Sequence, residues 1–132
     1  MIQVYISSHD RDGAEALAAI LEAEGDIEVV STWHDAPMGR TADKTVEERV
    51  AIAQRNYEQI ARAQVLVFQS GPDRYPGGKA VEAGIALGEG LEIVVVGRRE
   101  NIMLWHPNVH AVEEPIEEGS IAHAVRLAAG RA

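Results

Sequence analysis

The sequence lacks cysteine, is poor in aromatic residues and has no long apolar run. Without cysteine, a disulfide framework, a thiolate zinc site and a cysteine nucleophile are all excluded. No apolar run approaches the roughly 20 residues that cross a bilayer. The opening MIQVYIS also lacks the basic segment and apolar core of a signal peptide. We therefore expect a cytoplasmic protein with no membrane partner.

Basic residues are scarce as well: 12 Lys and Arg stand against 21 Asp and Glu, which gives a formal net charge of −9. Such a chain repels a polyphosphate backbone, so no nucleic-acid partner is expected. A small anionic ligand remains compatible, because backbone N–H groups can bind it locally. The hydrophobic fraction of 46% and the length of 132 residues are those of a single folded domain, residues 1–132.

Several catalytic and cofactor motifs are missing. The five histidines have no metal-site spacing, since His106 and His110 flank Pro107 and cannot share a helix face. There is no Gly-x-Ser-x-Gly elbow of a serine hydrolase. The pair Gly77 and Gly78 is not followed by the Lys-Ser or Lys-Thr of a Walker loop. The motifs predict neither a metal nor another cofactor.

What is present is an alternation of strands and helices. The order predicts a Rossmann-like or flavodoxin-like α/β fold, a doubly wound parallel sheet of four to five strands with a two-sided core. Asp12, the Thr45–Glu48 capping box and Ser120 mark helix starts. Strands are expected at 3–6, 27–32, 65–68, 91–96 and 109–112, and helices at 13–24, 45–62, 79–87 and 120–129. The apolar stripe of the second helix is Val50, Ala53, Tyr57, Ile60 and Ala61.

The carboxyl ends of the strands are where such sheets bind ligands. The turns there are expected to hold residues 7–10, 33–43, 70–78 and 98–106. The second of these turns belongs to a loop of about a dozen residues, and loops of that length in compact domains are often functional.

Glu82 is the sharpest candidate for chemistry. It is expected in the first turn of its helix, among Ala80, Ala83, Gly84 and Ala86, small residues that let a helix press close to a sheet. One interpretation is a glutamate that only stabilises the helix dipole, worth about 0.3–1 kcal/mol. The other is a nucleophile, which the same dipole would keep ionised.

The other candidates each have two readings. Gly77 and Gly78 form either an anion cradle or a flexible turn, and Lys79 holds a phosphate or is solvated. Tyr5, opposite Val4 and Ile6 on the first strand, either reaches the site or is half-buried beneath a helix. Trp33, with His34 beside it, stacks on a base or covers the edge of the core.

The run GGKAVEAGIALGEGLEIVVVG, together with VYISS near the N-terminus, resembles the nucleoside 2-deoxyribosyltransferase superfamily. The resemblance covers about residues 1 to 112. That superfamily includes transferases that exchange bases on deoxyribose and relatives that hydrolyse deoxynucleoside 5′-monophosphates. The resemblance implies an enzyme in which Glu82 attacks the anomeric carbon and Tyr5 orients the attacking carboxylate.

The same resemblance implies substrate contacts. Ser7 and Ser70 are counterparts of serines that bind phosphate in the hydrolases. Asn101 is similar to an asparagine that reaches into a neighbouring subunit's site, which implies a homo-oligomer with shared sites. Trp33 would cover the base of a small nucleoside or nucleotide. Asp35, Gly78 and Lys79 are further candidates to bind the substrate.

Two positions depart from the family pattern, because Asn56 and Gln64 stand where aspartates are usual. Asparagine can hydrogen-bond a substrate but cannot deliver a proton, and Asp10, Asp35, Asp43 or Asp73 would have to replace the missing acid. Three functions therefore stay open: a transferase, a deoxynucleoside monophosphate hydrolase, and a nucleotide-binding or sensor module without catalysis.

Overall fold

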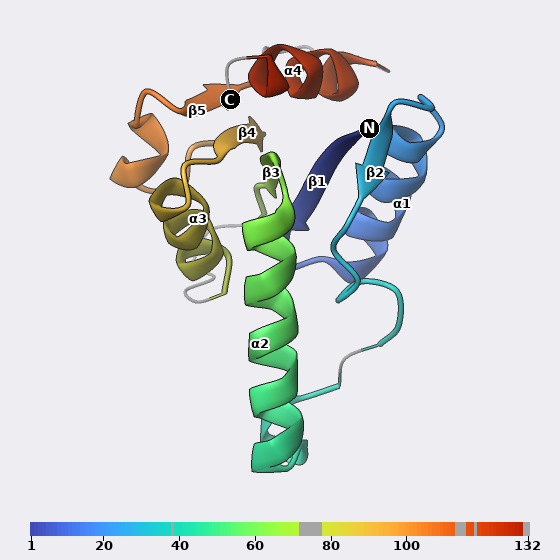
Figure 1. Ribbon diagram of the computed structural model, residues 1–132, viewed down its shortest axis with the longest axis vertical. Helices are drawn as coiled ribbons and strands as arrows, with labels where there is room; N and C mark the ends of the chain where they lie inside the picture. Colours follow the sequence, from blue (N-terminus) through green and yellow to red (C-terminus); the bar gives the residue numbers. More distant parts are fainter. Residues whose placement is uncertain (38, 72–77, 113–115, 118, 131–132) are drawn as a thin grey trace.

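In the computed structural model, which describes residues 1–37, 39–71, 78–112, 116–117 and 119–130, five parallel strands form one sheet flanked by helices (Figure 1). The predicted α/β class and the strand number are confirmed. The strands are β1 Ile2–Ser7, β2 Ile27–Val29, β3 Val65–Gln69, β4 Glu92–Val96 and β5 Val109–Ala111. The helices are α1 Arg11–Glu22, α2 Val46–Arg62, α3 Gly78–Gly88 and α4 Ser120–Ala129, with short 3-10 turns η1 Thr41–Asp43 and η2 Ile102–Trp105.

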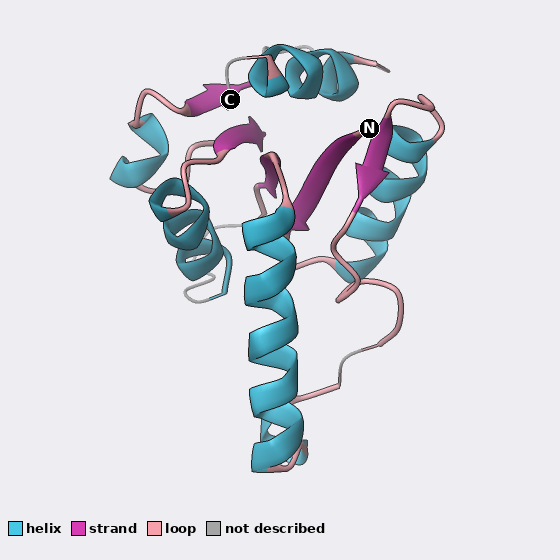
Figure 2. Cartoon of the chain, viewed as in Figure 1, coloured by secondary structure: helices cyan, strands magenta, loops and turns pink. Residues whose placement is uncertain are grey.

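The sheet is buried on both faces, as its apolar strands require. Alternate residues of β1 show this: Val4 and Ile6 belong to one core, whereas Tyr5 belongs to the other. The helices α1 and α4 supply the first core, and α2 and α3 supply the second (Figure 2). The predicted two-sided core and the predicted facing of Tyr5 are both confirmed.

The strand order is β2-β1-β3-β4-β5. The chain leaves β1 toward one edge of the sheet, returns to pair β3 with β1, and then proceeds toward the other edge. Crossovers therefore diverge at the carboxyl ends of β1 and β3, and a reversal of this kind opens a crevice that ligands use. The fold thus places its switch point beside Ser7 and Gln69, the last residues of these strands.

The helix α2 extends well beyond the sheet (Figure 1). Its predicted capping box is present, with Thr45 and Glu48 exchanging side-chain-to-backbone hydrogen bonds. Its apolar stripe does not pack as predicted, because Ile60 is buried whereas Val50 and Tyr57 are exposed. Seventeen helical residues span about 25 Å, more than the five residues of β3 can cover. Only the C-terminal part of the helix reaches the core.

Other boundaries differ for local reasons. The first helix begins at Arg11, so Asp12 lies inside it. The last helix is preceded by Gly119 in the left-handed region at φ 87°, and the Ser120 hydroxyl accepts a hydrogen bond from Glu117 instead of capping the helix. In the described part of the chain, every helix is too short or too polar to traverse a bilayer.

Candidate active site

A cavity of about 610 Å³ opens at the carboxyl end of the sheet, beside the switch point. Its walls come from the turns after β1 and β2 and from the facing sides of α2 and α3. These two turns are among the four where the sequence predicts a ligand site. The described lining residues are Ser8, His9, Trp33, Ala53, Asn56, Tyr57, Ile60, Gly78, Lys79, Val81, Glu82 and Ile85.

Glu82 is the one carboxylate among the described lining residues. Its two oxygens are held by different residues of β1: the Tyr5 hydroxyl donates to Oε2, and the Ser7 hydroxyl donates to Oε1 at 2.8 Å. Tyr5 and Ser7 are two positions apart on one strand, and therefore they point to the same face of the sheet. Both are fully buried, so the carboxylate is held by rigid donors.

Burial raises the pKa of Glu82, and the hydrogen bonds from Tyr5 and Ser7 lower it in part. The pKa of the Tyr5 phenol is strongly raised as well, first by burial and then by the negative charge of Glu82. The phenol is therefore a permanent donor to the carboxylate at ordinary pH. A partly desolvated carboxylate with fixed donors on both oxygens is suited to bind or attack an electropositive carbon.

Glu82 does not lie where the sequence suggested. It is the fifth residue of α3 and not part of its first turn. Its ionised form is therefore stabilised by the hydroxyls of Tyr5 and Ser7 and not by the dipole at the start of the helix. The small residues also divide: Ala83 and Ala86 pack on the sheet, whereas Ala80 and Gly84 face solvent. Close packing of α3 thus depends on two alanines.

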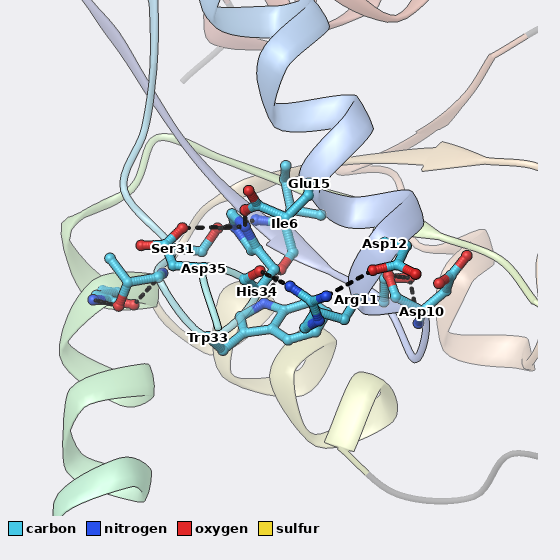
Figure 3. Close-up of polar contacts among 12 residues, drawn as sticks. Ile6, Asp10, Arg11, Asp12, Glu15, Ser31, Trp33, His34 and Asp35 are labelled. Carbon is cyan, nitrogen blue, oxygen red and sulfur yellow. Dashed lines mark hydrogen bonds and ion pairs between the residues drawn. The ribbon is translucent and has the colours of Figure 1, made fainter. Parts of the chain in front are cut away.

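Trp33 forms one wall of the cavity, and contacts with the backbone of β1 and with His34 hold its side chain in place. Its indole N–H donates to the carbonyl oxygen of Ile6 at 2.7 Å, and the ring meets the edge of His34 at a centroid distance of 5.2 Å (Figure 3). The hydroxyl of Ser31 accepts the Ile6 N–H at 3.1 Å. Side chains therefore replace the backbone of β2 beside Ile6, which explains why β2 ends at Val29 and not at Thr32 as predicted.

Asn56 lines the cavity from α2, and its side-chain oxygen accepts two N–H groups of Arg55, at 3.2 and 3.3 Å. Ala53, Tyr57 and Ile60 line it too, although the sequence analysis assigned them to the core. The spacing i, i+3, i+4 and i+7 of these four residues marks one face of a helix. Periodicity identified that face correctly, but it does not distinguish a face on a core from a face on a cavity.

Lys79 lies in the cavity wall but is not solvated, which corrects one of its two interpretations. Its side chain is 6% exposed, and its ammonium donates to Glu100 at 2.6 Å and lies 4.9 Å from the centre of the Phe68 ring. Burial raises the pKa of Glu100, but hydrogen bonds from Lys79 and the Gly71 N–H outweigh it, and the net pKa is lowered. The pair ties the start of α3 to the turn after β4.

Four predicted substrate residues lie outside the described lining of this cavity. One of them, Ser7, lies behind Glu82 and bonds to it. Asp35 is exposed and borders a separate, smaller cavity. The Ser70 hydroxyl donates to the carbonyl of Arg98, and Asn101 is exposed and accepts the Met103 N–H at the start of η2. The proposed replacement acids Asp10 and Asp43 do not line the described wall either. Gly77 and Asp73 lie outside the described residues.

Neither a protein-family model nor a curated protein matches this sequence. Solved structures do match its fold. A 2-deoxyribosyltransferase from Bacillus psychrosaccharolyticus aligns with a TM-score of 0.63 and 16% identity, covering 90% of this chain and 95% of its own. A CMP N-glycosidase from Clostridium botulinum aligns with a TM-score of 0.59 and 18% identity, over 95% and 97%. The chain has the fold of these enzymes.

The resemblance noted in the sequence is thereby confirmed at the level of the fold. Solved structures with other kinds of names also match this fold. A putative pilus assembly-related protein from Burkholderia pseudomallei aligns with a TM-score of 0.61 and 17% identity, over 99% of this chain and 91% of its own. A function for this chain must therefore rest on the chemistry of its cavity.

Proposed function

We propose that this protein cleaves the N-glycosidic bond of a nucleoside or nucleotide, with Glu82 as the nucleophile. The observation that carries the proposal is a half-buried carboxylate, held on both oxygens by Tyr5 and Ser7, in the wall of a cavity large enough for a small ligand. Two enzymes of the same fold are named for chemistry on this bond, which supports the reaction class.

In the first step, a carboxylate oxygen of Glu82 forms a bond to C1′ of the sugar. The C1′–N bond breaks, and its electron pair leaves with the base, which takes up a proton. The glycosyl ester is then opened by water or by a second base, which bonds to C1′ and releases the carboxylate. Two displacements on one carbon give net retention, as in retaining glycosidases.

Tyr5 and Ser7 would serve as positioning residues. Each hydroxyl fixes one carboxylate oxygen, so a lone pair is directed into the cavity while rotation of the carboxylate is restrained. Holding a nucleophile in a near-attack geometry removes part of the entropic barrier. Ser7 would therefore act on Glu82 and not on a phosphate, which revises the role that the resemblance gave it.

Trp33, from the loop after β2, and Asn56, from α2, would contact the base. The indole offers a fixed apolar face, on which a base can stack. The side-chain oxygen of Asn56 is engaged by Arg55, which leaves its amide N–H groups to meet an acceptor of the substrate. Gly78 and Lys79 complete the wall near α3. Asn56 cannot donate a proton as a carboxylic acid would, so departure of the base is expected to be slow.

Hydrolase and transferase remain the two forms of this proposal. Release of free sugar or sugar phosphate from a nucleoside or its 5′-monophosphate alone would identify a hydrolase. Exchange between deoxyinosine and free adenine would identify a transferase. The neighbour named as a CMP N-glycosidase makes cytidine 5′-monophosphate and its deoxy form the first substrates to test.

A non-catalytic nucleotide-binding module is the second candidate. Asn56 favours it, because the described lining then offers no acid besides Glu82 to protonate the leaving base. Calorimetry with the same nucleotides distinguishes it: saturable binding of an intact ligand, with no base released over prolonged incubation, is its signature.

The decisive experiment compares Glu82→Gln with Glu58→Gln. Glu58 is an exposed glutamate of α2 outside the described cavity wall, so its variant controls for loss of one negative charge. Base release measured by chromatography should be abolished in Glu82→Gln and kept in Glu58→Gln. Turnover by Glu82→Gln equal to that of the unmodified protein would refute the nucleophile.

A further inference from the structure

A second group of ligand-type side chains lies on the opposite face of the sheet from Glu82. Glu15 of α1 and the neighbouring residues His34 and Asp35 of the loop after β2 converge there (Figure 3). One donor atom from each lies within 4.8 Å of the others. His34 Nδ1 is hydrogen-bonded to Glu15 and is 3.6 Å from Asp35 Oδ1. Among the described residues, this is the one convergence of three such donors.

The imidazole of His34 is held in a fixed orientation. The residue is 1% exposed, and its Nε2 is 2.8 Å from the hydroxyl of Ser31, which itself accepts the Ile6 N–H. A serine hydroxyl both donates and accepts, so this contact persists with the ring proton on either nitrogen. Nδ1 therefore points at the two carboxylates. A fixed partner on the far nitrogen is the arrangement that metal-binding histidines have.

The order Ser31, His34, Glu15 resembles a nucleophile-base-acid chain, but the serine cannot attack a substrate. Ser31 is 2% exposed, and the backbone N–H of Ile6 already donates to its oxygen. The same oxygen is also in contact with His34 Nε2. The accessible side of the cluster is the other one, where Glu15 and Asp35 meet solvent.

The charges at that side favour a cation. Glu15 and Asp35 bring two carboxyl groups together beside one imidazole. The guanidinium of Arg11 is hydrogen-bonded to Asp12 and to the carbonyl of His34, so its charge is shared with Asp12. An adjoining cavity of about 250 Å³ is bordered by Glu22 and Thr32 as well, which leaves room for water ligands.

We propose that Glu15, His34 and Asp35 bind a divalent transition-metal ion of the zinc class. One imidazole nitrogen and two carboxylate oxygens would supply three protein ligands, and water would complete the coordination shell. An imidazole ligand favours Zn²⁺, Co²⁺ or Ni²⁺ over Mg²⁺ and Ca²⁺, which prefer oxygen alone. Binding requires the ring proton on Nε2, where it is donated to Ser31.

This site cannot be recognised from the sequence, because its ligands are not spaced as a motif. Glu15 and His34 are 19 positions apart, and only the packing of α1 against the β2 edge brings them together. A bound ion would link α1 to the loop that carries Trp33.

The test is a calorimetric titration of the metal-free full chain with ZnCl₂ and, separately, MgCl₂. We expect one equivalent of Zn²⁺ to bind, with Mg²⁺ failing to saturate the site at the same concentrations. Glu15→Ala and Asp35→Ala should each weaken Zn²⁺ binding by about tenfold or more, the scale of effect seen even for outer-shell partners. Both side chains are partly exposed, so the variants are expected to fold.

His123→Gln is the matched control, because His123 is an exposed histidine of α4 remote from the cluster in sequence. It should bind Zn²⁺ like the unmodified chain. Thermal unfolding gives an independent readout: Zn²⁺ should raise the Tm of the unmodified chain and of His123→Gln, but not of Glu15→Ala. The proposal would be overturned if the unmodified chain did not bind Zn²⁺, or if Glu15→Ala and Asp35→Ala bound Zn²⁺ as tightly as the unmodified chain does. His34 would then be a structural residue. None of these measurements requires a nucleoside.

Discussion

At the residue scale, the proposed chemistry depends on the contact between Glu82 and the hydroxyls of Tyr5 and Ser7. Burial raises the pKa of Glu82, whereas both hydroxyls lower it. The nucleophilic form is the anion. The proposed activity should therefore fall as the pH decreases through this raised pKa. The pH at which this fall occurs, the acidic limb of the pH profile, depends on how strongly the two hydroxyls stabilise the carboxylate anion.

Tyr5→Phe is predicted to move the acidic limb of kcat/KM to higher pH, because the variant loses a donor that stabilises the carboxylate anion. Ser7→Ala should shift it in the same direction. A pH profile of base release measures both. Tyr57→Phe is the control, since the Tyr57 hydroxyl donates to Glu89 and not to Glu82. An unchanged limb in Tyr5→Phe would remove Tyr5 from the proposed mechanism.

Glu82 should also affect the stability of the fold in a pH-dependent manner. A carboxyl group whose pKa is higher in the folded state than in the unfolded state adds to the free energy of unfolding. This contribution is fully present below the pKa of the unfolded state, and it is lost as the pH rises through the pKa of the folded state. The unmodified chain should therefore lose stability relative to Glu82→Gln as the pH increases from about 4 toward neutrality. Urea unfolding of both proteins across this range measures the difference. A difference that does not vary with pH would contradict the raised pKa.

Asn56→Asp is predicted to increase the rate of base release, because it introduces a carboxyl where the cavity has no acid beyond Glu82 among its described lining. General acid catalysis contributes about 10²–10⁴-fold. The neighbouring Arg55 would favour the ionised form of the new carboxyl, so the gain should be largest at low pH. Steady-state rates of the two proteins test this. A slower Asn56→Asp would indicate that the amide itself binds the substrate.

At the element scale, the helices and strands were predictable where local signals act, and less so at their ends. The Thr45–Glu48 capping box fixed the start of α2, and the short apolar run of β3 indicated a strand buried on both faces. The end of β2 was not predictable, because it depends on Ser31 and Trp33 bonding to Ile6 across the sheet. No local signal encodes a contact between residues 25 or more positions apart.

The partial packing of α2 leads to a prediction about stability. Ile60→Ala should lower the free energy of unfolding by about 2–5 kcal/mol, since Ile60 is fully buried. Val50→Ala, on the same predicted stripe but 49% exposed, should change it by less than about 0.5 kcal/mol. Urea unfolding followed by circular dichroism compares them. Similar losses in both variants would mean that the outer turns of α2 are covered in solution.

At the scale of the whole molecule, the sequence correctly indicated the fold class. It also singled out Glu82, which lies in the wall of the cavity at the carboxyl end of the sheet. It could not indicate which candidates share one cavity. Ser70 and Asn101 follow β3 and β4 as predicted, yet their side chains bond to nearby backbone and lie outside the described wall. A residue must lie at the correct edge of the sheet to belong to the site, but its side chain must also point into the cavity. The direction of the side chain is set by packing, which the sequence does not reveal.

Asn101 can still serve a neighbouring chain, and the surface suggests where one would lie. Ile102, Met103 and Trp105 of η2, which follow Asn101 directly, are large apolar residues that remain exposed, and a group of such residues often marks an interface. We expect a homo-oligomer with shared sites. Mixing inactive Asn101→Ala with inactive Glu82→Gln and allowing the chains to exchange should restore activity, because mixed oligomers contain an intact site. Sedimentation as a monomer, or no restoration, would contradict sharing.

Three consecutive residues of β1 connect both ends of the proposed substrate site. Tyr5 and Ser7 hold the attacking carboxylate from one face, while the main chain of Ile6 between them anchors the indole of Trp33 and the hydroxyl of Ser31. The separation between the point of attack and the stacking surface is thus set within a single pleat of the sheet. If the proposed reaction holds, the distance that a substrate must span from sugar to base is set by β1, which holds Glu82 directly and fixes Trp33 through the carbonyl of Ile6.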